Sequence, residues 1–424
     1  MKIKKRFLIY RIALYCVIFF WMHGLYLLRY PSFLSVISGQ EAYRYFLSIL
    51  SVLMFVSVVL MYRSHIKKIG GLINYFYLYA FSYACLFLYS IIIYDRQSVI
   101  STLHVGGPFL IPLLVPVFLI IWIDDRANFD KILKYVDLIT FLWSVVLIFQ
   151  SLYFKSHHTF AFDFMNYFTT GVTFRDDSVR LSLGAVANMM MVYRMYVFFY
   201  EERHGVRHIY NFISICTSLY ALIVIQQTRM YTFTMAVVFL VLLFCSGKSN
   251  RIKLISAIIV GVASYILLTN NIVSNFIESF ALNSDKGVST LARINEIGYY
   301  GSCFLKNPIF GNGFASDVEY PYIEHGVMGS LYYVDVGIIG LLAQIGICGV
   351  IFYVVPLIRM VQTTVSSIKY TKNWQIDVGL TTYMLLTSGT LLQIHPVQVL
   401  AFVLVFAYFE YRRYRLSESN RMWR

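Results

Sequence analysis

The chain has 424 residues, of which 59% are hydrophobic and only 13% are charged. This composition excludes an ordinary soluble domain, because such a domain would expose too much apolar surface to water. The net charge of +14 is compatible with nucleic-acid binding, but the basic residues lie between apolar segments, so we expect no nucleic-acid partner.

Apolar runs long enough to cross a bilayer recur along the whole chain. They lie at about 7–28, 43–62, 72–93, 103–123, 132–154, 181–200, 209–226, 231–246, 252–269, 331–358, 376–393 and 396–411. The sequence therefore predicts an all-α, polytopic membrane helix bundle of about 12 transmembrane helices, with residues 1–424 forming a single membrane domain.

The distribution of lysine and arginine predicts the orientation of these helices. If Met1 is cytoplasmic, roughly 23 basic residues fall on the cytoplasmic side and about 10 on the outer side, as the positive-inside rule requires. Both termini are then cytoplasmic. The amino-terminal apolar run is too long for a secretion signal and lacks a cleavage site, so we expect it to remain as the first helix. Five of the six cysteines fall within predicted spans, which implies neither a disulfide framework nor a zinc site.

Two predicted outer loops are much longer than a simple connection requires. They cover residues 155–180 and 270–330, and loops of this length are usually functional or disordered. The second is rich in aromatic and aliphatic residues, so we expect a partly helical segment that folds over the outer mouth of the bundle. Ser289 is expected to cap a helix that runs to about Leu305.

Within the predicted helix of the second loop, Arg293 and Glu296 share one face. The segment Phe310-Gly311-Asn312-Gly313-Phe314 follows, in which Gly311 and Gly313 permit a tight turn because glycine tolerates positive φ. An ordinary turn is the more frequent outcome for such a segment, and a ligand-contacting loop is the alternative.

Outer-face arginines contradict the positive-inside rule and so require an explanation. Arg175 and Arg180 end the first long loop, Arg229 lies in a short outer hairpin, and Arg293 lies in the second long loop. A guanidinium group is always charged and its planar fork matches phosphate oxygens, so converging arginines could hold a diphosphate. The alternative is that each contacts lipid headgroups or a nearby acid.

No acid or base on the outer side is selected by its spacing alone among the candidates Asp176, Asp177, Glu296, Asp317, Glu319, Glu324, His325 and Asp335. His325 could act as a general base near neutral pH, or be an incidental loop histidine. Asp335 is a possible acid, or a capping residue at the start of the next helix. Asp317 and Glu319 could clasp a metal ion, but a solvated acidic turn is the more frequent arrangement. We find no phosphate-binding glycine loop in the sequence.

The layout and several motif traces resemble the family of bacterial O-antigen polymerases and O-antigen ligases, which includes capsule and exopolysaccharide polymerases. Thr228-Arg229-Met230-Tyr231 is similar to the family's Ser/Thr-Arg at the start of a helix. Arg293, followed by Asn307-Pro308-Ile309-Phe310-Gly311-Asn312-Gly313, resembles its arginine-led short helix and glycine turn. Asp335-Val336-Gly337-Ile338-Ile339-Gly340 is similar to the start of the helix that closes its large loop.

This resemblance implies a glycosyltransferase of the bacterial cytoplasmic membrane that uses a polyprenyl-diphosphate-linked oligosaccharide, with no metal and no cofactor. Arg229 and Arg293 would hold the diphosphate, Arg180 would be a further anion contact, and His325 would be the base. Membrane lipid and a chain-length regulator are the other partners that it implies. The family's ligases usually carry His-Asn before the closing helix, where this chain reads Gly329-Ser330-Leu331-Tyr332-Tyr333, so a polymerase is favoured over a ligase.

A non-enzymatic exporter of lipid-linked oligosaccharide is the third interpretation. It should show two similar halves and charged residues deep within its helices. The sequence contains no evident repeat, and its predicted spans are nearly free of charge, which disfavours an exporter.

Overall fold

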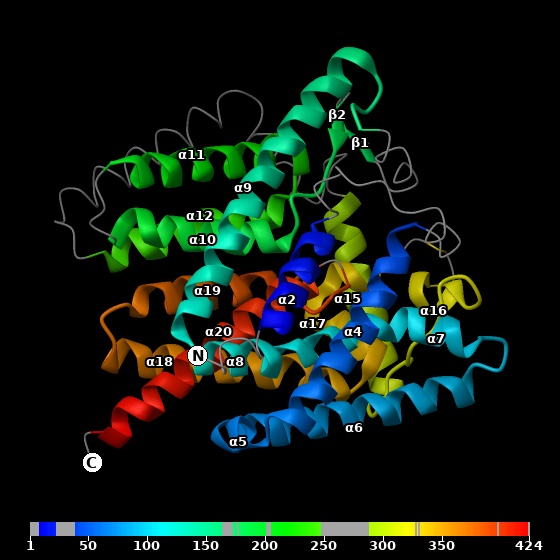
Figure 1. Cartoon of the computed structure of the whole chain (residues 1–424). Helices are drawn as coiled ribbons and strands as arrows, with labels where there is room; N and C mark the ends of the chain where they lie inside the picture. Colours follow the sequence, from blue (N-terminus) through cyan, green and yellow to red (C-terminus); the bar gives the residue numbers. More distant parts are fainter. Residues whose placement is uncertain are drawn as a thin grey trace.

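The structure is a computed structural model. It describes residues 8–22, 39–162, 173–175, 178–200, 205–246, 288–326, 329, 331–396 and 398–422. Most of these residues are helical. Several long helices run roughly parallel, while those at Gly39–Met61 and Arg126–His157 cross them obliquely (Figure 1). The predicted all-α bundle is therefore confirmed at this level.

The amino-terminal half of the bundle consists of successive helices, and from α4 onward short turns join them. They are α2 (Leu8–Trp21), α4 (Gly39–Met61), α5 (Arg63–Ile66), η2 (Lys67–Ile69), α6 (Gly70–Ile93), α7 (Val99–Gly106), η3 (Gly107–Leu113), α8 (Leu114–Asp124) and α9 (Arg126–His157). The 3₁₀ segment η3 contains two prolines, Pro108 and Pro112, which cannot donate the hydrogen bonds of a regular α-helix. The Asp125 side chain caps α9 by accepting a hydrogen bond from the Ala127 amide.

The carboxy-terminal half contains the remaining helices and one short hairpin. Its elements are β1 (Thr173–Arg175), β2 (Ser178–Arg180), α10 (Ala185–Tyr200), α11 (Val206–Tyr220), η5 (Ala221–Gln226), α12 (Arg229–Cys245), α15 (Val288–Lys306), α16 (Pro321–His325), η6 (Tyr333–Val336), α17 (Gly337–Ile345), η7 (Val350–Val354), α18 (Val355–Tyr370), α19 (Trp374–Thr387) and α20 (Val399–Met422). Strands β1 and β2 pair antiparallel, with Thr173 opposite Arg180.

Five described helical segments are long and apolar enough to cross a membrane, by length and composition, and they indicate a membrane protein. They are Gly70–Ile93, Val99–Asp124, Arg126–His157, Val206–Gln226 and Val350–Tyr370. Four shorter apolar helices, Leu8–Trp21, Phe46–Met61, Arg229–Cys245 and Tyr333–Ile345, accompany them. The predicted span 252–269 lies outside the described residues. The total of twelve spans therefore stays a prediction.

The prediction of one continuous helix over 331–358 is wrong. The chain instead forms η6 and α17, turns at Gly346, and continues through η7 into α18. Gly346 has a φ of +58°, and a Cβ atom there would lie 2.4 Å from the Ile309 carbonyl oxygen. The close approach of the 309 backbone therefore interrupts the helix at a position where only glycine fits without strain.

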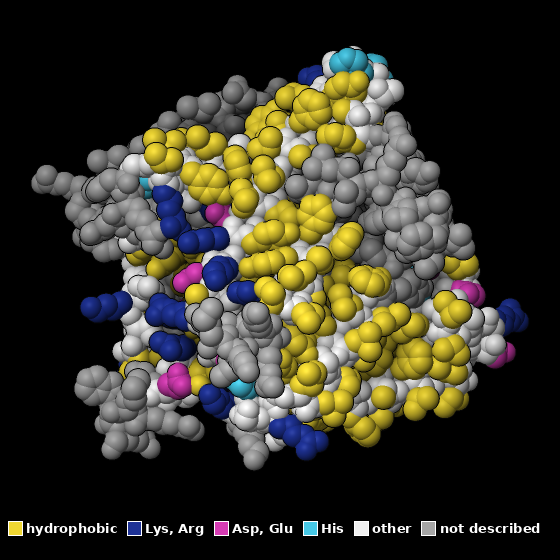
Figure 2. Space-filling model, viewed as in Figure 1, with side chains coloured by type: hydrophobic (Ala, Val, Ile, Leu, Met, Phe, Trp, Pro, Cys, Tyr) yellow, Lys and Arg dark blue, Asp and Glu magenta, His cyan; other side chains and the backbone are white. Residues whose placement is uncertain are grey.

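The two ends of the bundle differ in charge. At one end, here called the basic end, His65 pairs with Asp124, Tyr411 lies near Arg126, and Arg412 bonds to Thr371. The segments that meet there carry Arg63, Lys68, Arg126, Lys131, Lys134, Lys369, Lys372, Arg412 and Arg413. Figure 2 shows lysine and arginine side chains gathered at this end, on the left of the view, beside a broad apolar surface. The opposite end, here called the loop end, carries β1, β2, α7, α15 and α16 (Figure 1).

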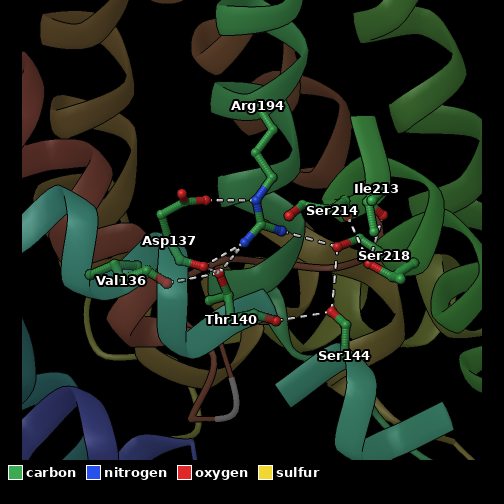
Figure 3. A network of polar contacts seen from close by, with 9 residues as sticks. Val136, Asp137, Thr140, Ser144, Arg194, Ile213, Ser214 and Ser218 are labelled. Atoms are coloured by element: carbon green, nitrogen blue, oxygen red, sulfur yellow. Dashed lines mark hydrogen bonds and ion pairs between the residues drawn. The ribbon is translucent and has the colours of Figure 1, made fainter. Parts of the chain in front are cut away.

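One arginine lies deep within the bundle with its charge fully partnered. The Arg194 side chain on α10 is 0% exposed, and its Nε donates to Asp137 Oδ1 on α9 at 2.7 Å (Figure 3). Its Nη1 donates to Ser218 Oγ on α11 at 3.1 Å, and its Nη2 donates to the Asp137 carbonyl and to Thr140 Oγ1. This single guanidinium group therefore joins α9, α10 and α11.

Two further ion pairs lie toward the basic end. The Arg359 guanidinium donates two hydrogen bonds to the Glu410 carboxylate, at 2.7 and 2.6 Å, and so links α18 to α20. Arg412 on α20 donates to Asp377 Oδ2 on α19 at 2.9 Å, and the Asp377 side chain is fully buried. The helices are thus less free of charge than we expected from the sequence, but these charges are paired with one another.

Replacing Arg194 by methionine is expected to destabilise the fold by about 3–5 kcal/mol, because it leaves the Asp137 charge without its partner. Thermal unfolding in detergent, followed by loss of monodisperse protein, measures this effect. Arg413→Met at an exposed position of α20 is the matched control and should leave the midpoint unchanged. An equal midpoint for the Arg194 and Arg413 variants would show that the buried network does not stabilise the bundle.

Candidate functional site

The hairpin β1–β2 brings Arg180 to the start of α12. The Nε of Arg180 donates a hydrogen bond to the Gln226 carbonyl oxygen at 2.9 Å, and Gln226 is the last residue of the π-helix η5. Gln227 then adopts a left-handed conformation with a φ of +53°, and α12 begins at Arg229. Arg180 is therefore bonded directly to the turn that carries Arg229. Asp176 and Asp177 lie outside the described residues, as does the side chain of Arg175.

Arg293 and Glu296 lie one turn apart on α15. This helix confirms the prediction of a helix from about residue 289 to 305, although it begins at Val288, one residue before the expected cap Ser289. Residues three apart on a helix lie on the same side of it, so the two charged side chains are neighbours. The Nε of Arg293 and the Oε2 of Glu296 are both buried, and neither has a hydrogen-bonding partner in the part of the chain that the structure describes.

Asp335 joins the arginines of the two loops into one cluster. Burial raises the pKa of the Asp335 carboxyl, while the guanidinium groups of Arg293 and Arg180 act in the opposite direction. Both arginines must therefore lie close enough to interact with this one carboxyl. Asp335 belongs to the 3₁₀ turn η6 rather than to the first turn of a long helix, so the expected capping geometry is replaced by a short turn held against α15.

A backbone contact fixes the position of η6 relative to α15. The Tyr332 amide donates to Glu296 Oε1 at 3.0 Å, immediately before η6. Burial raises the pKa of the Glu296 carboxyl and Asp335 raises it further, whereas the Tyr332 amide and Arg293 lower it. The charged cluster, defined as Arg180, Arg293, Glu296 and Asp335, contains residues of β2, α15 and η6. Sequence spacing placed Glu296 on the Arg293 face, but gave no sign that Asp335 lies near both.

His325 lies at the end of α16, next to the same connecting segment. Its Nδ1 is 3.2 Å from the Leu331 carbonyl oxygen, and its ring contacts the Tyr332 ring edge-on, with centroids 4.8 Å apart. The neighbouring Glu324 lines a small cavity together with Tyr300 and Tyr333. Burial and the Asp317 carboxylate raise the pKa of Glu324 to about 6.

The turn at Gly311 and Gly313 packs onto the bundle. Gly311 has a φ of +58° and Gly313 a φ of +73°. The Gly313 amide donates to the Gln344 carbonyl of α17 at 2.7 Å, and the next amide, that of Phe314, donates to Ser90 Oγ of α6 at 2.8 Å. This turn therefore anchors the chain between α15 and α16 to two helices of the bundle.

The acidic pair Asp317 and Glu319 forms part of a hydrogen-bonded turn. Glu319 accepts hydrogen bonds from the hydroxyl groups of Ser316 and Ser101. These bonds favour the ionised form and lower the pKa of Glu319. No group of three or more metal-ligating side chains is found among the described residues.

A comparison of this chain with models of known protein families and with curated proteins finds no match. The functional interpretation therefore depends on the geometry of the charged cluster and on the motif traces in the sequence.

Gly311→Ala is expected to destabilise the protein by about 2 kcal/mol or more, because alanine is strained at positive φ. Its Cβ atom would also lie 2.5 Å from the Ala343 carbonyl oxygen. Gly298→Ala on α15 is the matched control, since its Cβ atom would meet nothing within 4 Å and alanine favours a helix. Thermal unfolding of both variants should give shifts of opposite sign, and a neutral Gly311→Ala would contradict the packed turn.

Glu324→Gln is expected to stabilise the protein above pH 6. The folded-state pKa of about 6 exceeds the usual 4.5, so the stability that the protonated carboxyl contributes at low pH is lost as the pH rises from about 4.5 through 6. The difference is at most about 2 kcal/mol and about 1 kcal/mol after allowing for partial exposure of the group. Unfolding midpoints of both proteins at pH 5 and pH 7.5 measure it, and an equal gap at both values would refute it.

Proposed function

We propose that this protein is a membrane glycosyltransferase, most specifically a polymerase of O-antigen, capsule or exopolysaccharide. It would transfer a glycan from a polyprenyl diphosphate carrier to a lipid-linked acceptor at the outer face of the bacterial cytoplasmic membrane. The observation that carries this proposal is the convergence of arginines from separate loops at the loop end.

The connections between these arginines support a diphosphate site. Arg180 and Arg293 interact with the same Asp335 carboxyl, and Arg180 is bonded to the turn that leads into Arg229. Guanidinium groups approaching from two sides can bind the oxygens of both phosphates through charge-assisted, forked hydrogen bonds. In this proposal the donor diphosphate takes the place of Asp335 as the counter-charge of the arginines.

The charge difference between the two ends of the bundle supports the proposed orientation. By the positive-inside rule the basic end faces the cytoplasm, so the loop end faces outward. Both termini would then be cytoplasmic in a bundle of about twelve spans, and residues 155–180 and 270–330 would cover the outer mouth. In this orientation the arginines would lie at the outer membrane surface, where the headgroup of a lipid-linked oligosaccharide would be.

The proposed reaction needs no nucleotide, because cleavage of the sugar–phosphate bond supplies the driving force. A hydroxyl group of the acceptor attacks the anomeric carbon, the bond from that carbon to the diphosphate oxygen breaks, and the electron pair remains on the diphosphate. Arg180, Arg229 and Arg293 stabilise the negative charge that develops there. Membrane lipid and a chain-length regulator are the further partners of this proposal.

Export is the second candidate, and the Arg194–Asp137 pair is the observation that bears on it. Ionisable groups inside a membrane bundle often mark transport pathways. Every nitrogen of this guanidinium nevertheless donates to groups on α9 or α11, which also fits a structural link. Ligase activity, the other alternative, would use the same arginines with a different acceptor.

Arg229→Ala and Arg293→Ala are each expected to abolish polymer while leaving the protein in the membrane, because each removes part of the diphosphate site. Arg→Lys at either position should also impair synthesis, since lysine lacks the planar fork. Arg96→Ala is the matched control, an exposed arginine at the loop end outside the charged cluster. Polymer length on gels of membrane extracts measures the effect, and full-length polymer from both alanine variants would remove the diphosphate site.

Purified protein with lipid-linked repeat units in detergent separates the three activities. A ladder of lengthened products indicates a polymerase, whereas a single transfer to a different lipid acceptor indicates a ligase. Movement of labelled lipid across vesicles without any lengthening would favour an exporter.

A further inference from the structure

Glu296 is buried, one of its carboxylate oxygens has no hydrogen-bonding partner among the described residues, and it lies next to Arg293. The side chain is 2% exposed, and its Oε1 accepts the Tyr332 amide proton at 3.0 Å. Its Oε2 has no hydrogen-bonding partner among the described residues, and the same holds for the Nε of Arg293 one turn earlier. A buried carboxylate oxygen without a partner is costly, and such a group in a native structure requires an explanation.

Charged and polar groups surround the Glu296 carboxyl and act on its pKa. Arg293 and Tyr300 flank it on α15, while Asp335 and the Tyr332 amide approach from the segment around η6. Burial and Asp335 raise its pKa, and the Tyr332 amide and Arg293 limit the rise. Carboxyl groups whose pKa is raised toward neutral pH are suited to general acid–base catalysis.

His325, the base expected from the sequence, has a different environment from Glu296. Its Nδ1 faces the Leu331 carbonyl oxygen, and its ring rests against Tyr332. It therefore contacts the segment before η6, whereas Glu296 interacts electrostatically with Arg293 itself. A base that receives a proton during attack must reach the acceptor hydroxyl at the anomeric carbon, next to the site where the diphosphate is bound. Glu296, one turn from Arg293 and with an oxygen that has no partner among the described residues, meets this requirement better than His325, whose Nδ1 already faces a carbonyl oxygen.

We propose that Glu296 is the general base of the glycosyl transfer, an inference that rests on the proposed function. As the acceptor oxygen bonds to the anomeric carbon, its proton passes to Glu296 Oε2, while the diphosphate departs with the electron pair of the broken bond. The proton is then released to water when the product leaves, which restores the carboxylate. The Tyr332 amide holds the other oxygen and so directs Oε2 toward the site.

Glu296→Gln tests this role, because the glutamine amide oxygen still accepts the Tyr332 hydrogen bond while the basic oxygen is lost. Initial rates of lengthening with a purified lipid-linked repeat unit should show kcat reduced about 100-fold or more. KM should stay within about threefold, since diphosphate binding by the arginines is retained. Asn295→Ala, at an exposed position of the same helix, is the matched control and should keep both constants.

The pH profile separates catalysis from positioning. In the unaltered protein the rate should rise with pH as the Glu296 carboxyl ionises, and this rise should be missing from the residual rate of Glu296→Gln. A purely structural Glu296 would leave the rise in place. Unfolding midpoints of Glu296→Gln and Asn295→Ala, measured alongside, show whether both variants are folded.

Different results would overturn the role of Glu296 and the proposed function. If the unaltered protein lengthens the substrate and Glu296→Gln keeps its kcat or its pH profile, Glu296 is not the base and the transferase remains. If His325→Gln loses the rate while Glu296→Gln does not, the base is His325. An unaltered protein that lengthens no lipid-linked substrate would overturn the proposed function and this role together.

Discussion

A charged side chain withheld from water must find partners within the protein, and this constraint separates the two kinds of charged group in the structure. Arg194 and Arg359 donate hydrogen bonds from their buried nitrogens to carboxylates and hydroxyl groups on other helices. At the loop end, by contrast, a nitrogen of Arg293 and an oxygen of Glu296 are buried without partners among the described residues. The first kind of group stabilises the bundle. The second kind of group has the arrangement expected of a ligand-binding site without its ligand.

The position of this site depends on contacts between segments far apart in the chain. Gly346 admits the backbone of Ile309, and the turn that follows carries Gly313 to the Gln344 carbonyl. These contacts hold α15 against α17, and the Glu296–Tyr332 hydrogen bond then sets η6 beside α15. These contacts keep Asp335 near enough to Arg293 and Arg180 for both to lower the pKa of its carboxyl.

The sequence predicted the parts of the molecule that depend on local pattern. Long apolar runs identified the helical bundle, and the helix carrying Arg293 and Glu296 followed from its spacing and from the Asn307-Pro308 stop. The break within 331–358 could not be predicted, because it depends on how closely Ile309 approaches Gly346. An apolar run with glycines gives no sign of such an approach.

In the candidate site, too, local pattern predicted some residues, and contacts between distant segments decided the rest. Arg180, Arg229 and Arg293 could be selected because basic residues on the outer side of a membrane protein are unusual, whereas Asp335 could be named only as a possible acid or capping residue. Glu296 could be placed on the Arg293 face and named as one of several possible acids or bases. It could not be preferred over the others, since the Tyr332 amide and Asp335 come from a segment more than thirty positions later. The hydrogen bond of Arg180 to Gln226 spans 46 residues and has no local signature either.

The placement of the paired charges also bears on the choice between transfer and export. Alternating access requires groups of helices to move against one another around a central site. In this bundle Arg194 connects α9, α10 and α11, and the pairs of Arg359 and Arg412 connect α18 and α19 to α20. A movement within either of these two groups of helices would separate buried charges from their partners at a cost of several kcal/mol per pair. The proposed transfer needs no such movement, because its substrates would meet at the loop end, where the charged cluster lies next to helices that these pairs hold together.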